Sequence, residues 1–440
     1  YMFKKKNISN LFYLFLIAHL FVWTLIPSIT NNNLPLDTIE ALAWGSNLDW
    51  GYNKHPPVSA FFVEFFYFFF ESNDIAYYFL SQIFVISAFY IVWIFSNEFF
   101  QNKTLSFFSV LILEGIYFYN FTTPEFNVNV CQLPFWALMV YFSWKLYIRK
   151  DSNTIILILL GITAAIGFLT KYLFAYLLLS VIMIFAYEFF ITKTRKINFK
   201  HYLPIEIFFV LLVPHLIWLF QNDFVTIKYA FNRAGLVDFS FLNHFKFPII
   251  FLIKQIGILI PFFILCYFVI KKIKIRFDIK DKKKLFILLI NFLPIILMFV
   301  TSVVTGSKIR TMWMTPFYLF FGVFILSMFD VKDDEKTFNE FFKPFLILFL
   351  LSPITYGLVS LISENKRTDY KGKVEANKVL QVWQKDFTEK INVVLGDEWH
   401  AGNISYHMEG RPVWLGEINQ KNVDLLNAYI CTKKVCVGYR

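Results

Sequence analysis

Long apolar segments recur along this chain, and they restrict its fold more than any other feature of the sequence. Several windows of about 20 residues carry few or no charges, which is the length that a helix needs to cross a bilayer. Hydrophobic residues make up 57% of the chain, against about 45–50% in soluble domains, and no segment alternates like the strands of a transmembrane barrel. We therefore expect an all-α polytopic membrane protein with about eleven transmembrane helices. The expected spans are 11–29, 75–96, 104–120, 126–147, 154–170, 172–191, 203–220, 248–270, 285–304, 311–329 and 343–362.

Positive charges indicate how these spans are oriented. Three lysines at 4–6 precede the first span, and the loop at 271–284 is the most basic in the chain. The positive-inside rule places both in the cytoplasm only if the apolar run at 58–71 does not cross the membrane. That run is short for a span and contains Glu64, so we expect it to be a juxtamembrane or half-inserted helix on the outer side. The first span lacks a small-residue cleavage site, which is typical of a retained anchor.

The same orientation divides the chain into two domains. We expect residues 1–362 to form the transmembrane domain, with outer loops at 30–74 and 221–247, and residues 363–440 to form a small α/β domain on the outer side. The second outer loop is either a lid over an outer site or a plain connector. The net charge of +11 is typical of basic cytoplasmic loops and contact with anionic lipid, not of nucleic-acid binding. The elements expected in the C-terminal domain are a strand at 391–395, a helix near 401–408 and a strand near 412–415.

A long polar passage, DTIEALAWGSNLDWGYNKHPP, occupies residues 37–57 of the first outer loop. Its first two acids, Asp37 and Glu40, have the spacing of a helix capping box. A capping box does not account for Lys54 or for the aromatic rings of the passage, and a merely connecting loop has no need of this mixture. The rings either contact a sugar or a lipid or belong to the aromatic belt of the membrane interface. They are Trp44, Trp50, Tyr52 and His55.

Further charges are expected at the outer edge of the membrane. Glu125 lies in the turn at 121–127, where it either favours the dipole of the next helix or forms a second acid of the site. A charge at membrane depth costs about 2.5–3.5 kcal/mol, so cations there are usually paired or functional, although each could instead snorkel to the interface. The basic residues that the topology places on the outer side are Lys54, Lys171, Lys228, Arg233, Lys308 and Arg310.

Short motifs follow the first outer loop in a definite order. HPP stands at 55–57, TTPE at 122–125, and the C-terminal part carries GNISYH at 402–407 and RPVWLGE at 411–417. This order resembles the GT-C class of integral-membrane glycosyltransferases. The resemblance covers most of the chain and is closest to the bacterial branch related to protein O-mannosyltransferases, which includes the aminoarabinose lipid A transferase.

The resemblance implies roles for individual residues. Asp37 would be the acid of the catalytic cavity, with Glu40 and Glu125 as catalytic neighbours, and Asp37 would act as general base if the acceptor is a hydroxyl. Lys54 would be the lysine near the di-proline motif, although here a histidine separates it from the prolines. Fixed cations would stabilise the charge that develops on a leaving phosphate. The expected donor-phosphate ligands are Lys54, Lys171, Lys308 and Arg310.

The resemblance also implies a substrate class. We expect a hexosyl- or pentosyltransferase that moves a sugar from undecaprenyl phosphate to lipid A or a related envelope glycolipid, at the periplasmic face of the bacterial inner membrane. A direct single displacement would invert the anomeric centre. Protein O-glycosylation by the same class, transport of a lipid-linked sugar and a non-catalytic binding role are the alternatives. The sequence has no metal-ligand spacing, so it indicates no metal cofactor, although a divalent metal is not excluded.

Overall fold

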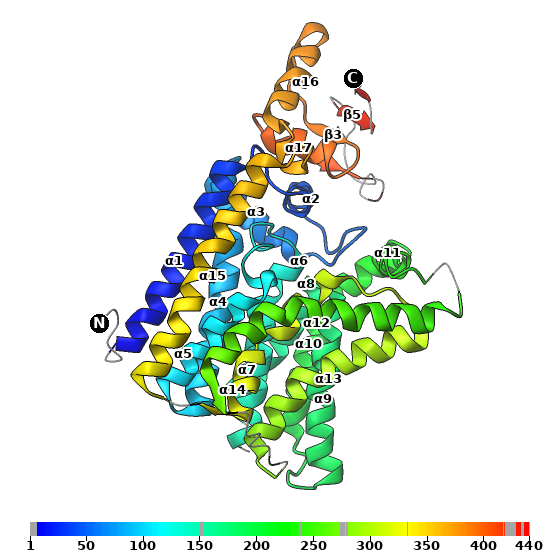
Figure 1. Cartoon of the computed structure of the whole chain (residues 1–440). Helices are drawn as coiled ribbons and strands as arrows, with labels where there is room; N and C mark the ends of the chain where they lie inside the picture. The colour runs from blue at the N-terminus through cyan, green and yellow to red at the C-terminus, as the bar shows by residue number, and fades with distance from the viewer. Residues whose placement is uncertain are drawn as a thin grey trace.

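A bundle of long helices with a small domain at one end forms the molecule (Figure 1). The structure is a computed structural model, and it describes residues 7–149, 153–236, 240–272, 278, 280–331, 333–416, 418, 428–432 and 435–439. The first helix, α1 (Ile8–Thr30), runs toward the end of the bundle that carries the small domain. We call this end the upper end, from its place in Figure 1, and the opposite end the lower end.

The long helices confirm the all-α polytopic membrane class. Among the described residues, seven helices are long and apolar enough to cross a membrane, and a pair bent by 56° at Thr311–Tyr318 and Phe321–Met328 makes eight if it forms one span. The expected number of about eleven spans is not confirmed, because three apolar segments form helices that are short or interrupted. The seven are α1, α4 (Asp74–Phe100), Tyr172–Ile191, Phe199–Gln221, α12 (Asn243–Val269), α13 (Lys282–Thr305) and α15 (Glu335–Ile362).

The shorter helices have local causes. Gly115 lies so close to α12 that an added Cβ would come within 2.5 Å of Phe262 Cα, so the chain turns there to pack directly on the neighbouring helix. Asn127 caps a new helix by accepting hydrogen bonds from the next two free backbone N–H groups. The shorter elements are α5 (Lys103–Leu111), η2 (Ile112–Gly115), η3 (Tyr117–Tyr119), α6 (Val128–Cys131), α7 (Leu133–Arg149), α8 (Thr154–Thr170), η4 (Tyr172–Phe174), α9 (Ala175–Ala186), η5 (Tyr187–Ile191), η6 (Phe199–Tyr202), α10 (Leu203–Gln221), η7 (Thr311–Tyr318) and α14 (Phe321–Met328).

The segments that connect the helices lie at the two ends of the bundle. At one end, β1 (Ile270–Lys272) pairs with β2 (Asp330–Val331) in an antiparallel ladder. There Arg195, from the loop after η5, lies 3.2 Å from Glu188 and donates to the carbonyl oxygen of Leu146. At the upper end lie α2 (Leu36–Gly45), α3 (Val58–Phe70) and α11 (Val225–Arg233).

The apolar helix α3 stays at the upper end. It begins two residues after Pro56, which lines a cavity described below. Just beyond its last residue, the Ser72 hydroxyl donates to the carbonyl oxygen of Tyr406 in the C-terminal domain, at 2.5 Å. Both ends of α3 therefore lie beside upper-end elements, and the helix does not run to the lower end.

The C-terminal part folds as an α/β unit with elements close to the expected ranges. Strands β3 (Val393–Leu395) and β4 (Val413–Leu415) are parallel and are joined through α17 (His400–His407). The full sheet has the order β4-β3-β5-β6, with β5 parallel to β3 and antiparallel to β6. The other elements are η8 (Arg367–Asp369), α16 (Gly372–Asp386), β5 (Ala428–Thr432) and β6 (Val435–Tyr439).

This unit is fastened to the transmembrane part by buried polar and apolar contacts. Gly402 of α17 lies against α2, where an added Cβ would stand 3.0 Å from the Cβ of Ala43. Arg411 lies 2.7 Å from Glu64 of α3 and also donates to the carbonyl oxygen of Leu42 at 2.9 Å. Two further hydrogen bonds join Asn33 to Asn403 at 2.8 Å and Tyr406 to Asp74 at 2.8 Å.

Candidate active site

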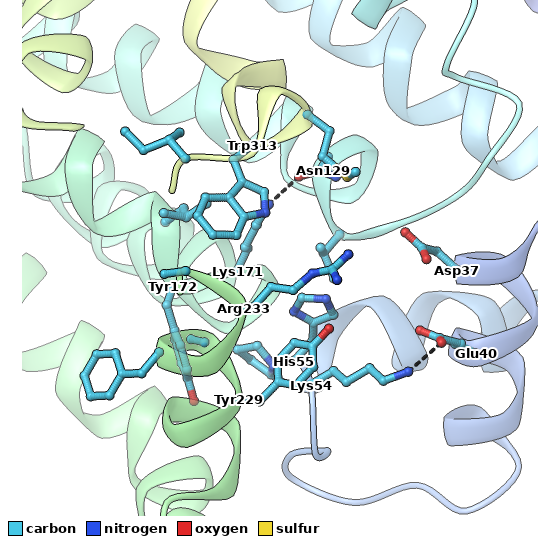
Figure 2. A pocket seen from close by; sticks show the side chains of 18 of the residues that line it. Asp37, Glu40, Lys54, His55, Asn129, Lys171, Tyr172, Tyr229, Arg233 and Trp313 are labelled. Carbon is cyan, nitrogen blue, oxygen red and sulfur yellow. Dashed lines mark hydrogen bonds and ion pairs between the residues drawn. The ribbon is translucent and has the colours of Figure 1, made fainter. Parts of the chain in front are cut away.

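A cavity of about 970 Å³ lies where α2, the turn after α8, helix α11 and the C-terminal domain meet. Its wall combines carboxylates, cations and aromatic rings from segments that are far apart in the sequence (Figure 2). The described polar and aromatic residues that line it include Asp37, Glu40, Lys54, His55, Asn129, Lys171, Tyr172, Tyr229, Arg233, Trp313, Arg367, Asp397, Glu398, Trp399 and His400.

Helix α2 presents both of its acids to this cavity. Asp37 and Glu40 are three residues apart in a helix, so they lie on the same face. The N-cap of α2 is Pro35, with no side-chain capping bond, so Asp37 does not cap the helix as the capping-box interpretation requires. Burial raises the pKa of Asp37, whereas Lys54, Lys171, Arg233 and Arg367 lower it. Four cations therefore converge on one carboxylate.

Glu125 lies behind Asp37 rather than in the cavity wall. Its Oε1 accepts a hydrogen bond from the backbone N–H of Asp37 at 3.0 Å, which satisfies a free amide in the first turn of α2. Burial and the neighbouring charge of Asp37 raise the pKa of Glu125. Glu125 thus holds the start of α2 in place from the turn at 121–127.

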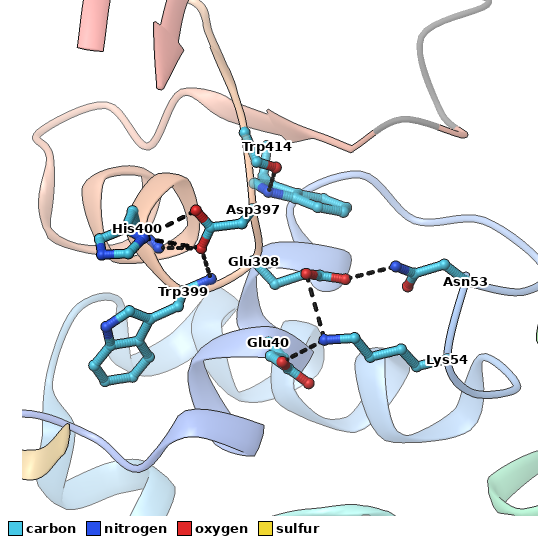
Figure 3. A network of polar contacts seen from close by, with 9 residues as sticks. Glu40, Asn53, Lys54, Asp397, Glu398, Trp399, His400 and Trp414 are labelled. Atoms are coloured by element: carbon cyan, nitrogen blue, oxygen red, sulfur yellow. Dashed lines mark hydrogen bonds and ion pairs between the residues drawn. The ribbon is translucent and has the colours of Figure 1, made fainter. Parts of the chain in front are cut away.

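Lys54 is held between two carboxylates. Its Nζ lies 2.6 Å from Glu40 Oε1 and 3.4 Å from Glu398 Oε2, and Asn53 also donates to Glu398 at 2.8 Å, as Figure 3 shows. Burial lowers the pKa of Lys54, but the two carboxylates outweigh it and the pKa is raised. Burial raises the pKa of Glu40 to about 7. Lys54 is therefore charged, with its charge largely compensated.

Lys171 is the most deeply placed cation of the cavity. It follows the last residue of α8 and is 5% exposed. Its Nζ donates to the side-chain oxygen of Asn129 and lies 5.7 Å from the centre of the Trp313 ring. Burial lowers its pKa to about 7, and the charge of Asp37 opposes this shift. Its contacts are an amide and an indole, so its charge is available to an anionic ligand.

Two cations of the cavity were not assigned to the site from the sequence. Arg233 is the last residue of α11 and Arg367 belongs to the segment after α15. Arg233 was counted among the outer cations but not distinguished from Lys228. Arg367 carried a usable signal, because it is a basic residue just outside a span at an end where the positive-inside rule does not favour one.

Lys308 and Arg310 do not line the cavity. Residues 307–310 follow the left-handed Gly306 and form no regular helix or strand, and burial alternates from one of these residues to the next. Ser307 and Ile309 face the cavity, whereas Lys308 is exposed. The backbone N–H of Lys308 donates to the carbonyl oxygen of Ala234 at 2.8 Å, which ties this segment to the end of α11.

Of the aromatic residues expected in the site from the first outer loop, some line the cavity and others do not. Trp44 and Tyr52 stack on each other with centroids 5.2 Å apart, and Trp50 packs its edge on Phe61 at 5.7 Å. These three rings stabilise the loop and lie outside the cavity wall. Only His55 lines the cavity, and burial lowers its pKa to about 3, so it is neutral.

The possible metal ligands of the described part of the chain are His, Cys, Asp and Glu side chains. Within the described residues, no group of three or more His, Cys, Asp or Glu side chains is placed to hold a metal ion. Glu40 and Glu398 are instead paired with Lys54, and Asp397 is paired with His400.

The sequence and the structure were compared with those of known proteins. Residues 54–218 match the family described as dolichyl-phosphate-mannose-protein mannosyltransferase. The structure resembles ArnT from Cupriavidus metallidurans bound to undecaprenyl phosphate, with a TM-score of 0.64 at 10% identity, over 94% of this chain and 86% of that chain. The chain has a GT-C glycosyltransferase fold. The apo state of the same ArnT is similar, with a TM-score of 0.61 at 11% identity, over 93% of this chain and 86% of that chain.

This GT-C fold and the matched family together indicate a membrane glycosyltransferase. A search of the curated proteins by sequence gives no match. The family match covers less than half of the chain, but it includes Lys54, His55, Glu125 and Lys171. Asp37 and the C-terminal wall of the cavity lie outside the matched segment, so their roles depend on the geometry described above.

Proposed function

We propose that this protein transfers a sugar from a polyprenyl phosphate to an acceptor at the periplasmic face of a bacterial inner membrane. The proposed donor is sugar-linked undecaprenyl phosphate, and the proposed acceptor is lipid A or a related envelope glycolipid. The observation that carries the proposal is the convergence of Lys54, Lys171, Arg233 and Arg367 on Asp37 in one cavity. A structure of similar fold binds undecaprenyl phosphate.

The donor phosphate would lie against Lys171 and Arg233. A phosphate gains negative charge as its bond to the sugar breaks, and cations fixed in a site poor in water stabilise that charge. Arg233 offers a planar fork suited to phosphate oxygens, and Lys171 acts as a point charge. The apolar side of the cavity, with Met298 and Ile309, would receive the first isoprene units of the lipid.

Asp37 would act on the acceptor. The acceptor oxygen attacks the anomeric carbon, the hydroxyl proton passes to the Asp37 carboxylate, and the bond to the phosphate oxygen breaks on the opposite face of the sugar. This single displacement inverts the anomeric centre. Burial raises the pKa of Asp37, which makes it a stronger base than an exposed aspartate, and the surrounding cations oppose this shift. An acceptor phosphate would need no base, and Asp37 would then orient the sugar.

A second candidate function is protein O-glycosylation. It is favoured by the matched family, whose description names protein mannosyl transfer. The cavity chemistry is the same for either acceptor, because both present a nucleophilic oxygen to the donor sugar.

Mass spectrometry of envelope glycoconjugates tests the proposal. Lipid A would be compared between cells that carry the gene, cells that lack it, and cells that carry the Asp37→Asn variant. The proposal predicts a sugar mass on lipid A that is lost in the second and third cases. Unchanged lipid A with a sugar lost from a glycoprotein would support protein O-glycosylation instead, and no change in any glycoconjugate would contradict a transferase function.

A further inference from the structure

One wall of the cavity is built by residues that follow the last long helix. Arg367, Asp397, Trp399 and His400 line this wall, and we call these four residues the C-terminal wall. Three of them belong to one turn at the start of α17, as Figure 3 shows. The donor cations Lys171 and Arg233 come from other elements around the same cavity, so the two sets are contributed by different parts of the chain.

The C-terminal wall is a fixed part of the site. Helix α17 is buried against α2, which carries Asp37 and Glu40. The backbone N–H of Asn32 donates to the carbonyl oxygen of Thr368 at 2.9 Å, which ties the segment of Arg367 to the first outer loop. The position of this wall relative to Asp37 is therefore set by the folded protein and not by a mobile lid.

An aromatic ring and hydrogen-bonding groups meet on this wall. The Trp399 ring lies 5.4 Å from the Tyr370 ring and 6.0 Å from the guanidinium carbon of Arg367. The Asp397 carboxylate lies 2.9 Å from His400 Nδ1 and accepts the backbone N–H groups of Trp399 and His400. Asp397 thereby fixes the imidazole, which is 40% exposed and keeps Nε2 as its second polar atom.

This chemistry suits one class of ligand. A pyranose ring has an apolar face that packs on an indole and hydroxyl groups that bond to imidazole and guanidinium groups. A peptide held in an extended form would instead use main-chain partners, and the C-terminal wall offers side chains. A ligand site with an apolar surface and a few placed polar groups is the usual form of small-molecule recognition.

We propose that the C-terminal wall is the acceptor subsite and that it holds a pyranose ring of a saccharide head group. This inference rests on the proposed glycosyltransferase function and assigns the acceptor to the cavity residues of the C-terminal domain rather than to the donor cations. The acceptor hydroxyl would then approach Asp37 while the Trp399 ring supports the sugar. Trp399, His400 and Arg367 bind the acceptor, and Asp397 positions His400.

The test measures binding of a saccharide probe to the full-length protein in detergent. The probe is the glucosamine disaccharide of lipid A after its acyl chains are removed, followed by saturation-transfer NMR or calorimetry. Trp399→Leu keeps an apolar side chain but removes the aromatic face, and we expect it to weaken binding about five- to tenfold. Trp399→Phe restores a ring and should stay within about twofold of the wild type. Glu409→Gln, an exposed change in the same domain, is the matched control.

A second variant keeps the test valid if Trp399→Leu does not fold. His400→Ala changes a partly exposed side chain and should weaken disaccharide binding about threefold or more by removing one hydrogen bond. The inference is overturned if both variants bind the disaccharide as the wild type does. It is also overturned if a Ser/Thr-containing peptide binds in a Trp399-dependent manner and the disaccharide does not.

A parallel measurement separates this inference from the proposed function. Undecaprenyl phosphate binding should be retained in Trp399→Leu, because the donor phosphate lies against Lys171 and Arg233. If the wild type fails to bind undecaprenyl phosphate, the donor assignment fails, whereas the disaccharide result still decides the subsite. Intact lipid A and the deacylated disaccharide should lose affinity by the same factor in Trp399→Leu, since the sugar is the part recognised. A loss confined to the intact lipid would overturn the assignment to a pyranose ring.

Discussion

The polar passage at 37–57 and the segment at 306–310 both lie beside the cavity, yet they present their charges in opposite ways. In the first, helix α2 places Asp37 and Glu40 on one face, toward the cavity. In the second, Ser307 and Ile309 line the cavity, whereas the cation Lys308 between them is exposed. A charged residue at the membrane edge therefore indicates that its segment lies near the site. Whether the charged side chain reaches the ligand depends on the local backbone conformation, which decides the side to which the side chain points.

The largest effect is expected at Asp37. Asp37→Asn removes the proposed base while keeping the size of the side chain, and sugar transfer should fall about 10²- to 10⁴-fold. Steady-state transfer assays in proteoliposomes would measure this. Asp49→Asn in the same loop is the control, because Asp49 accepts the backbone N–H of Trp50 at 2.7 Å and lies outside the cavity wall. A fall of less than tenfold in Asp37→Asn would remove Asp37 from the chemistry.

The contrast between Lys171 and Lys308 tests the comparison directly. Lys171→Ala removes a buried cation that faces the donor phosphate, so kcat/KM should fall about 10²- to 10³-fold. Lys308→Ala removes an exposed cation and should change kcat/KM by less than about twofold. Equal losses in the two variants would mean that Lys308 turns inward in the working enzyme.

Helix α11 offers the same contrast within one element. Arg233 lines the cavity, whereas Lys228, on the same helix, lies outside it. Arg233→Ala should lower the affinity for undecaprenyl phosphate about ten- to thirtyfold, as expected when a charged hydrogen-bond donor to phosphate is lost. Lys228→Ala should leave the affinity unchanged within error. The measurement is a binding titration of each purified variant, and a reversed order would exclude α11 from the donor site.

The smallest predicted effect is a pH dependence of donor binding. Burial lowers the pKa of Lys171 to about 7 and raises that of Glu40 to about 7. As the pH rises from about 6 to 8, Lys171 loses positive charge and Glu40 gains negative charge, so both changes weaken phosphate binding. Lys171→Arg stays charged throughout this range.

The pH experiment compares the two proteins with the same ligand. Undecaprenyl phosphate has its own ionisation near pH 6, which is common to both and cancels in the comparison. Affinity should fall about five- to tenfold more in the wild type than in Lys171→Arg between about pH 6 and 8. Parallel profiles would show that Lys171 does not change its charge in this range.

Much of the architecture follows from apolar length and the position of charge. The membrane class and the α/β elements near 393–415 were expected from sequence, because they depend on local pattern. The expectation that 58–71 is not a span came instead from the distribution of basic residues among the loops. The number of spans was not expected from sequence, because breaks such as the one at Gly115 arise from contact with α12. Close approach between distant helices leaves no periodic signal in one sequence.

The residues of the candidate site also fall into those that were expected from the sequence and those that were not. Asp37, Glu40, Lys54, His55 and Lys171 were expected together and line one cavity. Trp44, Trp50 and Tyr52 were expected there because aromatic residues often contact sugars, but Trp44 and Tyr52 stack on each other and Trp50 packs its edge on Phe61 of α3. The C-terminal wall was not expected, because its place depends on the docking of α17 on α2. Such long-range contact is visible only in the folded chain.

Binding of undecaprenyl phosphate, followed by native mass spectrometry, tests the central claim most directly. The wild type, Lys171→Ala and Lys308→Ala would be titrated with the lipid in the same detergent. The account predicts that the wild type and Lys308→Ala bind it with the same affinity and that Lys171→Ala binds it at least about tenfold more weakly. Equal binding by all three proteins, or no binding by the wild type, would contradict the assignment of this cavity to a polyprenyl-phosphate donor.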